Sequence, residues 1–237
     1  MKPKATVEEI RARFDLDVER FSDLETGQSA AIDAPLVLDL ITQSAAAVTP
    51  GAVSLLDIGC GAGNFTLKLL EAIPDLRDLV LVDLSRPMLD RAVERIGGRG
   101  SRLVTAWQSD IRDLDLPAGR FHLVVAAAVL HHLREEREWR AVFAAIHRSL
   151  RPGGSFWVAD LVEHAIPQVQ SILWRRYSEY LAGLKGPEYR DRVFAYVDYE
   201  DTPRPLVWQI DLLRQSGFAR VEVLHKNGCF AAFGALK

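Results

Sequence analysis

A short apolar segment that runs directly into three closely spaced glycines constrains the fold of this chain most strongly. The segment is Leu55-Leu56-Asp57-Ile58-Gly59-Cys60-Gly61-Ala62-Gly63, followed by Asn64, Phe65 and Thr66. Glycines at such a point let the backbone turn sharply, and a ligand can lie against the main chain because they have no Cβ atom. The spacing G-x-G-x-G differs from the G-x-G-x-x-G fingerprint that binds the pyrophosphate of dinucleotides. The motif predicts a strand–turn–helix unit that binds a ligand without a pyrophosphate; a tight turn with no ligand is the alternative.

Short apolar runs and longer helical patterns alternate along most of the chain. This alternation is typical of an α/β fold in which helices cover both faces of a parallel sheet. Only residues 226–229 separate the last two runs, and so short a link joins antiparallel neighbours. The sequence therefore predicts a mostly parallel seven-stranded sheet that ends in an antiparallel hairpin. The predicted strands are residues 53–58, 79–84, 103–108, 121–127, 155–160, 221–225 and 230–236, and the predicted helices between the first five are 64–72, 87–96 and 136–150.

The overall composition argues against nucleic acid and membrane partners. The 237 residues include 29 Lys and Arg against 32 Asp and Glu, whereas phosphate binding usually needs a clear basic excess. No apolar run approaches the ~18–20 residues that cross a bilayer, and the charged N-terminus lacks the apolar stretch of a signal peptide. The two cysteines, Cys60 and Cys229, form neither a CxxC metal site nor a disulfide framework. We expect a cytoplasmic protein.

Two more carboxylates follow the second and third predicted strands. Asp83 comes about 20 residues after the glycines, where an acidic residue is suited to accept hydrogen bonds from ribose hydroxyls. Ser85, rather than Asp83, is expected to cap the next helix. Asp110 could accept a hydrogen bond from an adenine amino group while Ile111 packs on the ring. Together with Asp57, which could help to bind an ammonium group, these residues suit S-adenosylmethionine (SAM), which has no pyrophosphate.

This set of residues resembles the class I SAM-dependent methyltransferase superfamily over nearly the whole chain. Residues 124–133, which would cross the carboxyl edge of the sheet, and residues 151–155, a turn leading into the fifth strand, fit the same superfamily. The resemblance implies a Rossmann-like fold and a SAM-dependent methyltransferase that acts on a small-molecule acceptor. It also implies that the cofactor site is lined by Asp57, Gly59, Gly61, Gly63, Asp83, Leu84, Asp110, Ile111 and Ala127.

Within the superfamily, two segments are similar to the carboxy-SAM synthase branch, which serves wobble-uridine modification in tRNA. They are residues 13–22 and the C-terminal segment from Gly217 to Lys237. The glycine motif, however, is of the ordinary methyltransferase type. Synthases of this branch use an arginine that pairs with the added carboxylate, and Arg190, Arg192 and Arg204 are candidates for it. Carboxy-SAM synthesis is therefore the main alternative; a SAM-binding protein without catalysis and an NAD(P) oxidoreductase are the others.

Two neighbouring histidines follow the fourth predicted strand. His131 and His132 are candidate catalytic residues, because a histidine can take up a proton near neutral pH. The alternative is that one packs against the cofactor and the other is exposed. His131, His132 and Glu135 are residue types that bind metals, but no third histidine or acidic cluster completes a site in the sequence, so no metal is predicted.

We expect one domain over residues 1–237, with a helical N-terminal region (1–48) and a helical insertion (161–205) that together form a lid. The insertion interleaves arginines with aromatic residues. Aromatic residues at helical spacing are typical of a core or of a homodimer interface. With arginines between them, they would also suit a small anionic or aromatic acceptor. The candidate acceptor-binding residues are Arg175, Arg176, Tyr177, Arg190 and Arg192.

Overall fold

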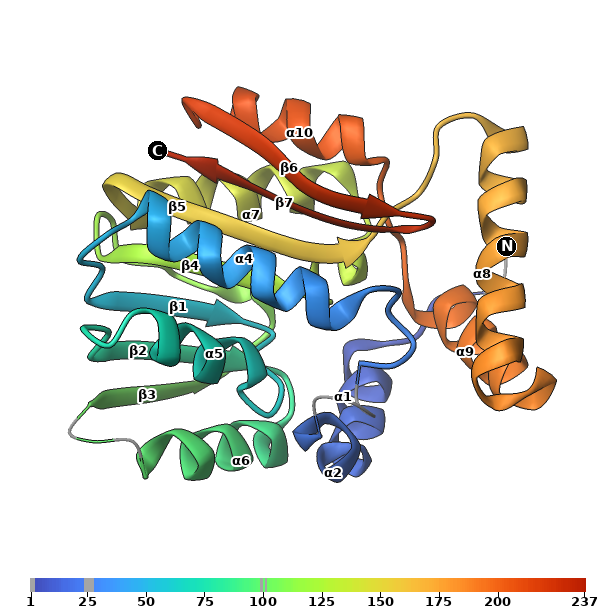
Figure 1. Ribbon diagram of the computed structural model, residues 1–237, viewed down its shortest axis with the longest axis horizontal. Helices are drawn as coiled ribbons and strands as arrows, with labels where there is room; N and C mark the ends of the chain where they lie inside the picture. The colour runs from blue at the N-terminus through green and yellow to red at the C-terminus, as the bar shows by residue number, and fades with distance from the viewer. Residues whose placement is uncertain (1–2, 24–27, 99, 101) are drawn as a thin grey trace.

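A computed structural model describes residues 3–23, 28–98, 100 and 102–237, and its centre is one seven-stranded sheet (Figure 1). The strand order is β3-β2-β1-β4-β5-β7-β6. The first five strands are parallel, and β7 runs antiparallel to both of its neighbours. The predicted α/β fold with a C-terminal hairpin is confirmed. The strands are β1 (Ser54–Ile58), β2 (Asp78–Asp83), β3 (Leu103–Gln108), β4 (Phe121–Ala127), β5 (Leu150–Leu161), β6 (Arg220–Asn227) and β7 (Phe230–Leu236).

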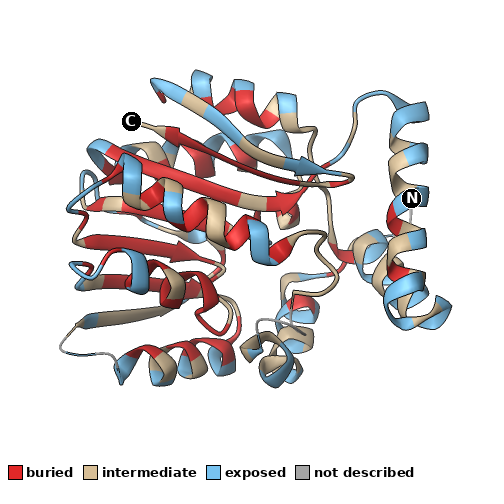
Figure 2. Ribbon diagram, in the orientation of Figure 1, coloured by how far each residue is buried: buried red, intermediate tan, exposed pale blue. Residues whose placement is uncertain are grey.

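Helices cover both faces of the sheet, and each face has its own apolar core. The helices α4 (Ala34–Val48), α5 (Asn64–Ala72) and α6 (Arg86–Gly97) pack on one face, and α7 (Glu136–Ser149) and α10 (Leu206–Gln215) pack on the other. Strand β1 is buried along its whole length, so its side chains contribute to both cores in turn: Leu55 to one and Leu56 to the other (Figure 2). Because the central strands are buried on both faces, their sequences are continuous apolar runs.

The fifth strand is longer than the sequence predicts. It begins at Leu150, so the prediction of a plain turn at residues 151–155 is wrong. The register shifts where Phe121 pairs with Leu150 and Leu123 with Ser155, which leaves the intervening segment as a bulge. Gly153 has φ +75°, and its N–H donates to the Lys237 carbonyl over 3.1 Å. The bulge thus stays paired with the C-terminal strand.

Among the described residues, four helices lie beyond the carboxyl ends of the parallel strands. They are α1 (Val7–Leu16) and α2 (Val18–Ser22) from the N-terminal region, and α8 (Pro167–Lys185) and α9 (Pro187–Glu200) from the insertion (Figure 1). The Tyr177 hydroxyl donates to the Ala30 carbonyl over 3.1 Å, which ties the two regions together. Part of the predicted N-terminal helical region, residues 1–2 and 24–27, lies outside the described residues.

Among the residues that the structure describes, no helix combines the length and the apolar character needed to cross a bilayer.

Candidate functional site

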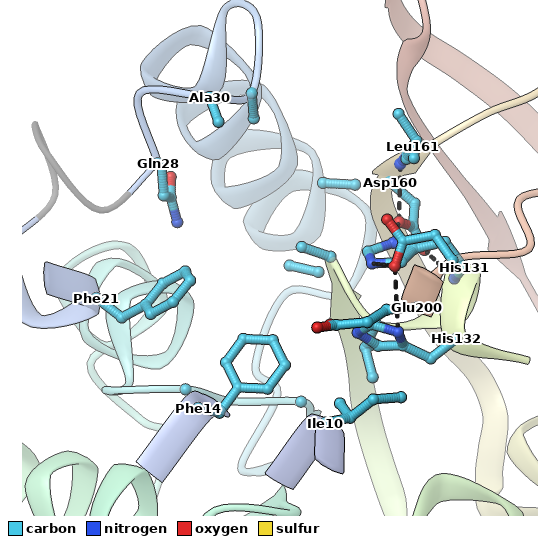
Figure 3. A pocket seen from close by; sticks show the side chains of 18 of the residues that line it. Ile10, Phe14, Phe21, Gln28, Ala30, His131, His132, Asp160, Leu161 and Glu200 are labelled. Atoms are coloured by element: carbon cyan, nitrogen blue, oxygen red, sulfur yellow. Dashed lines mark hydrogen bonds and ion pairs between the residues drawn. The ribbon is translucent and has the colours of Figure 1, made fainter. Parts of the chain in front are cut away.

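A cavity of about 570 Å³ opens at the carboxyl edge of the parallel strands, between the sheet and the four outer helices (Figure 3). Residues from the ends of β1, β2, β4 and β5 line its inner wall, and Phe14 and Phe21 from α1 and α2 line the opposite wall. In open α/β sheets, ligands bind in this crevice, where the strand order reverses around the first strand. The cavity therefore brings together the predicted cofactor motif and the predicted lid.

The glycine loop between β1 and α5 has a backbone that only glycine adopts readily. Gly59 has φ +67°, and a Cβ atom there would lie 2.7 Å from the Cβ of Val129. Gly61 has φ +50° and lines the cavity, but a Cβ atom there would meet no heavy atom within 4 Å. Gly63 does not line the cavity and instead precedes α5. Gly59 therefore permits close packing, whereas Gly61 leaves its main chain open to a ligand.

Two carboxylates at the ends of β1 and β2 line the cavity beside this loop. The Asp83 carboxylate accepts hydrogen bonds from the backbone N–H groups of Gly61 (2.8 Å) and Ser85 (2.9 Å), one on each oxygen. Desolvation raises the pKa of Asp83. Asp57 accepts a hydrogen bond from the Thr66 hydroxyl over 2.6 Å, and burial raises its pKa to about 7. Asp83 thus braces the glycine loop and still offers each oxygen to a second donor.

Asp110, the third predicted carboxylate, is bound by a neighbouring guanidinium. Both of its oxygens accept hydrogen bonds from Arg112, over 2.8 and 2.6 Å. Burial opposes ionisation, but this pairing outweighs it and lowers the pKa of Asp110. Ile111, Leu84 and Ala127 also line the cavity. Apart from Gly63, the predicted cofactor residues are therefore assembled on one wall.

The two predicted catalytic histidines lie in a short 3₁₀ helix, η2 (Leu130–His132), and have different environments. His131 Nδ1 bonds to the Asp160 carboxylate, and its Nε2 lies 3.6 Å from Asp201. Burial disfavours the charged imidazole, but the two carboxylates outweigh it and raise the pKa of His131 to about 9. His132 lies beside His131 with both ring nitrogens buried, and desolvation lowers its pKa. Neither ring nitrogen of His132 has a hydrogen-bond partner among the described residues.

An ion pair joins the N-terminal helices to the insertion beside the histidines. Arg13 of α1 donates two hydrogen bonds, over 2.6 and 2.5 Å, to Glu200 at the end of α9. Of the predicted acceptor residues, Tyr177 and Arg192 line the cavity. Arg175 and Arg176 are exposed on α8, and Arg190 pairs with Asp191; none of these three lines the cavity.

Sequence reasoning missed two carboxylates of the site, Asp160 and Asp201. Asp160 was detectable, because it lies near the carboxyl end of β5, just as Asp57 and Asp83 lie near the ends of β1 and β2. Asp201 follows α9 and reaches the histidines only through the tertiary fold, where the Thr202 N–H donates to the His131 carbonyl over 2.6 Å. No local sequence pattern marks that contact.

Comparison with known proteins agrees with this geometry. Residues 55–154 match the family model described as a methyltransferase domain, and this segment contains the glycine loop, Asp83, Asp110 and both histidines. Residues 55–154 therefore resemble a methyltransferase domain. This segment supplies most of the inner wall of the cavity, and the helices α1, α2, α8 and α9 lie outside it.

Individual relatives match at low identity. An uncharacterised methyltransferase of Mycobacterium tuberculosis is 31% identical over 139 residues, which are 59% of this chain and 64% of that protein. A carboxy-SAM synthase of Trichodesmium erythraeum is 27% identical over 77% of this chain and 72% of its own length. Human N-acetylserotonin methyltransferase, solved in complex with SAM, superposes with a TM-score of 0.63 at 16% identity, over 96% of this chain and 56% of that one. The chain thus spans less than two thirds of the Mycobacterium relative.

Proposed function

We propose that this protein is a SAM-dependent methyltransferase that acts on a small-molecule acceptor. One observation carries the proposal: a single cavity has the glycine loop, Asp83 and the histidines on its inner wall, and the helices of the N-terminal region and the insertion on its outer wall. A cofactor and an acceptor bound in one enclosed space can be held in line for transfer, which supplies much of the rate.

The residues of the inner wall fit SAM. Gly61 leaves open space where an adenosine or amino acid group could lie against the main chain. Asp83 has lone pairs left for the ribose hydroxyls after it accepts from Gly61 and Ser85. Asp57 would help to bind the ammonium group. Asp110 would accept from the adenine amino group with lone pairs that Arg112 leaves free, and Ile111 would pack on the ring.

When bound, SAM supplies an already activated methyl group, so the protein has chiefly to orient the acceptor and exclude water. Phe14 and Phe21 give the cavity an apolar outer wall, which suits water exclusion. His131 and His132 are the polar groups at the carboxyl end of β4, and we propose that they act on the nucleophilic atom of the acceptor. Arg192 and Tyr177 would contact the rest of the acceptor.

The acceptor class can be tested by incubating the protein with methyl-labelled SAM and a cell extract separated into small-molecule and macromolecular fractions. We expect label in the small-molecule fraction only. The matched control is Gly61→Val, which should bind no SAM and transfer no label. Transfer to the macromolecular fraction alone, or no transfer by protein that binds SAM, would contradict the proposal.

Carboxy-SAM synthesis is the second candidate, because a synthase of this kind is 27% identical over 77% of the chain and because Arg192 lines the cavity. Of the other candidate arginines, Arg190 pairs with Asp191, and Arg204 donates to the Arg134 carbonyl. Mass spectrometry of small molecules released from the purified protein separates the two functions. SAM or S-adenosylhomocysteine favours methyl transfer, whereas carboxylated SAM would establish the synthase.

A further inference from the structure

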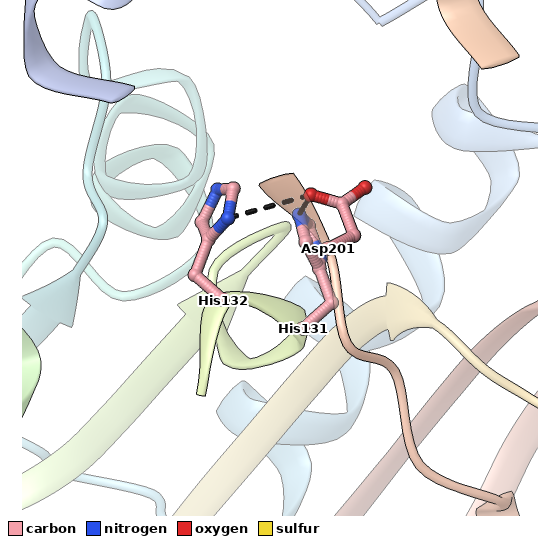
Figure 4. Close-up of side chains that lie close together, drawn as sticks. All are labelled: His131, His132 and Asp201. Atoms are coloured by element: carbon pink, nitrogen blue, oxygen red, sulfur yellow. Dashed lines mark ion pairs between the residues drawn. The ribbon is translucent and has the colours of Figure 1, made fainter. Parts of the chain in front are cut away.

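Three potential metal ligands converge at the cavity wall from two distant parts of the chain. His131 and His132 come from η2, and Asp201 comes from the end of α9 (Figure 4). One ligand atom from each lies within 4.8 Å of the others. Asp201 Oδ1 is 3.6 Å from His131 Nε2 and 3.4 Å from His132 Nδ1. All three residues line the cavity.

These separations suit a shared cation better than direct hydrogen bonds. A hydrogen bond between nitrogen and oxygen usually spans about 2.7–3.2 Å. Ligands at about 2.0–2.2 Å from a tetrahedral Zn²⁺ lie roughly 3.3–3.5 Å from one another. The Asp201–histidine distances are close to this spacing. Moreover, both ring nitrogens of His132 are buried and have no hydrogen-bond partner among the described residues, which is costly unless another group binds them.

Asp160 holds His131 in the orientation that a metal ligand needs. Its carboxylate bonds to His131 Nδ1 and accepts from the His131 backbone N–H over 3.2 Å, which leaves Nε2 directed toward Asp201. Histidines that bind metals usually donate their other ring N–H to such a carboxylate. The Leu161 N–H donates to the same carboxylate over 2.7 Å, so Asp160 is itself fixed.

The charges around the cluster also favour a cation. The Asp160 carboxylate lies beside the His131 imidazole, and the Asp201 carboxylate lies near both imidazoles. The nearby cation Arg13 is already paired with Glu200.

We propose that His131, His132 and Asp201 bind one divalent transition-metal ion of the Zn²⁺ type, with Asp160 as the carboxylate that orients His131. Two imidazoles and one carboxylate leave at least one coordination position, which would face the cavity. An acceptor hydroxyl or enol oxygen bound there would lose its proton more readily, because the metal stabilises the oxyanion. This role in transfer rests on the proposed function; metal binding itself does not.

The test is a titration of chelator-treated protein with Zn²⁺ in equilibrium dialysis and with Co²⁺ by visible absorption. We expect one equivalent per chain and a Co²⁺ spectrum of low-symmetry, four- or five-coordinate type. His132→Ala and Asp201→Asn should each weaken binding by at least tenfold. Asp160→Asn should weaken it by about 10–100-fold without removing a ligand. His164→Ala is the matched control, because His164 lies outside the cluster and bonds to Gln170; it should bind metal like the wild type.

A wild-type protein that binds no stoichiometric Zn²⁺ or Co²⁺ would overturn the proposal, whatever the variants do. Stoichiometric binding that survives in folded His132→Ala and Asp201→Asn would also overturn it, because the metal would then lie elsewhere. SAM binding measured on the same samples keeps the two proposals apart. If the protein binds SAM but no metal, only the proposal of a metal site is contradicted. If it binds metal but no SAM, only the proposed function is contradicted.

Discussion

The two walls of the cavity are built in different ways. The inner wall comes from one stretch of chain, from Asp57 to Leu161, in which the strand ends and the loops that follow them line the cavity. The outer wall is assembled by contacts between remote segments: Arg13 and Glu200 are 187 positions apart, and Tyr177 and Ala30 are 147 apart. The inner wall thus depends on local backbone conformation and the outer wall on tertiary pairing. Changes in the two walls should therefore have different effects.

The largest effect is expected from Gly61→Val. Its side chain would project into the cavity and also strain a backbone at φ +50°. We predict that SAM binding weakens by at least 100-fold, which is about 2.8 kcal/mol at 1.4 kcal/mol per tenfold. Isothermal titration calorimetry measures the change.

Gly51→Val is the matched control, because Gly51 has φ +76°, has equally open space for a Cβ atom and does not line the cavity. It should lower the free energy of unfolding by about 1–2 kcal/mol through strain, with SAM affinity within about threefold of the wild type. Equal losses of SAM binding in the two variants would mean that strain, rather than contact with the ligand, explains the result.

A smaller and more local effect is expected from Arg13→Gln on the outer wall. The change leaves the buried carboxylate of Glu200 without its guanidinium partner. We predict that the free energy of local opening of α1 and the end of α9 falls by about 2 kcal/mol. The equilibrium constant for opening then rises roughly 30-fold. Hydrogen exchange followed by mass spectrometry should show faster exchange there and unchanged exchange in β1 and β4.

The control for this experiment is Arg86→Gln, which breaks an exposed ion pair with Asp90 on α6 and should leave exchange in the lid unchanged. Faster exchange throughout the sheet in Arg13→Gln would show that the two walls unfold together and would remove the distinction between them.

The smallest effect concerns Asp110, which belongs to the inner wall but is paired with Arg112. The pKa of Asp110 is lowered in the folded protein, because the pairing with Arg112 outweighs the cost of burial. Because the pKa is lower in the folded state, the ionised carboxylate stabilises the fold at pH values above its unfolded pKa of about 3.9. This stability is lost as the pH falls through the lower pKa of the folded state. Wild type should exceed Asp110→Asn in the free energy of unfolding by about 1 kcal/mol at pH 6, and urea titrations should show this gap shrinking toward pH 3. A gap that does not depend on pH would exclude the ion pair as its cause.

The sequence predicts the inner wall well because local physics determines it. Continuous apolar runs mark the largely buried strands β4 and β7, and the predicted ranges 121–127 and 230–236 agree with them residue for residue. The predicted range 103–108 also agrees with β3, a partly buried edge strand. Ser85 caps α6 as predicted, accepting from the Met88 N–H over 3.3 Å. Strand β5 starts earlier than the sequence predicts. A proline and two glycines are typical of a turn, whereas here they form a bulge that stays hydrogen-bonded to the C-terminal segment.

The outer wall could not be predicted in the same way. Spacing alone does not reveal which arginine of a helix faces a cavity. The sequence therefore does not distinguish Arg192, which lines the cavity, from Arg175 and Arg176, which are exposed. The partners of the histidines were missed for a related reason, since Asp201 is 70 positions away from His131 along the chain and meets it only after α8 and α9 have folded back. The roles of these residues in acceptor binding stay predictions.

Binding of SAM to the wild-type protein, measured by isothermal titration calorimetry with NADH titrated in parallel, tests the central claim most directly. The inner wall predicts saturable binding of one SAM per chain and no binding of NADH, because the glycine loop has the wrong spacing for a pyrophosphate. Folded protein that binds no SAM, or that binds NADH instead, would contradict the assignment of this cavity to SAM.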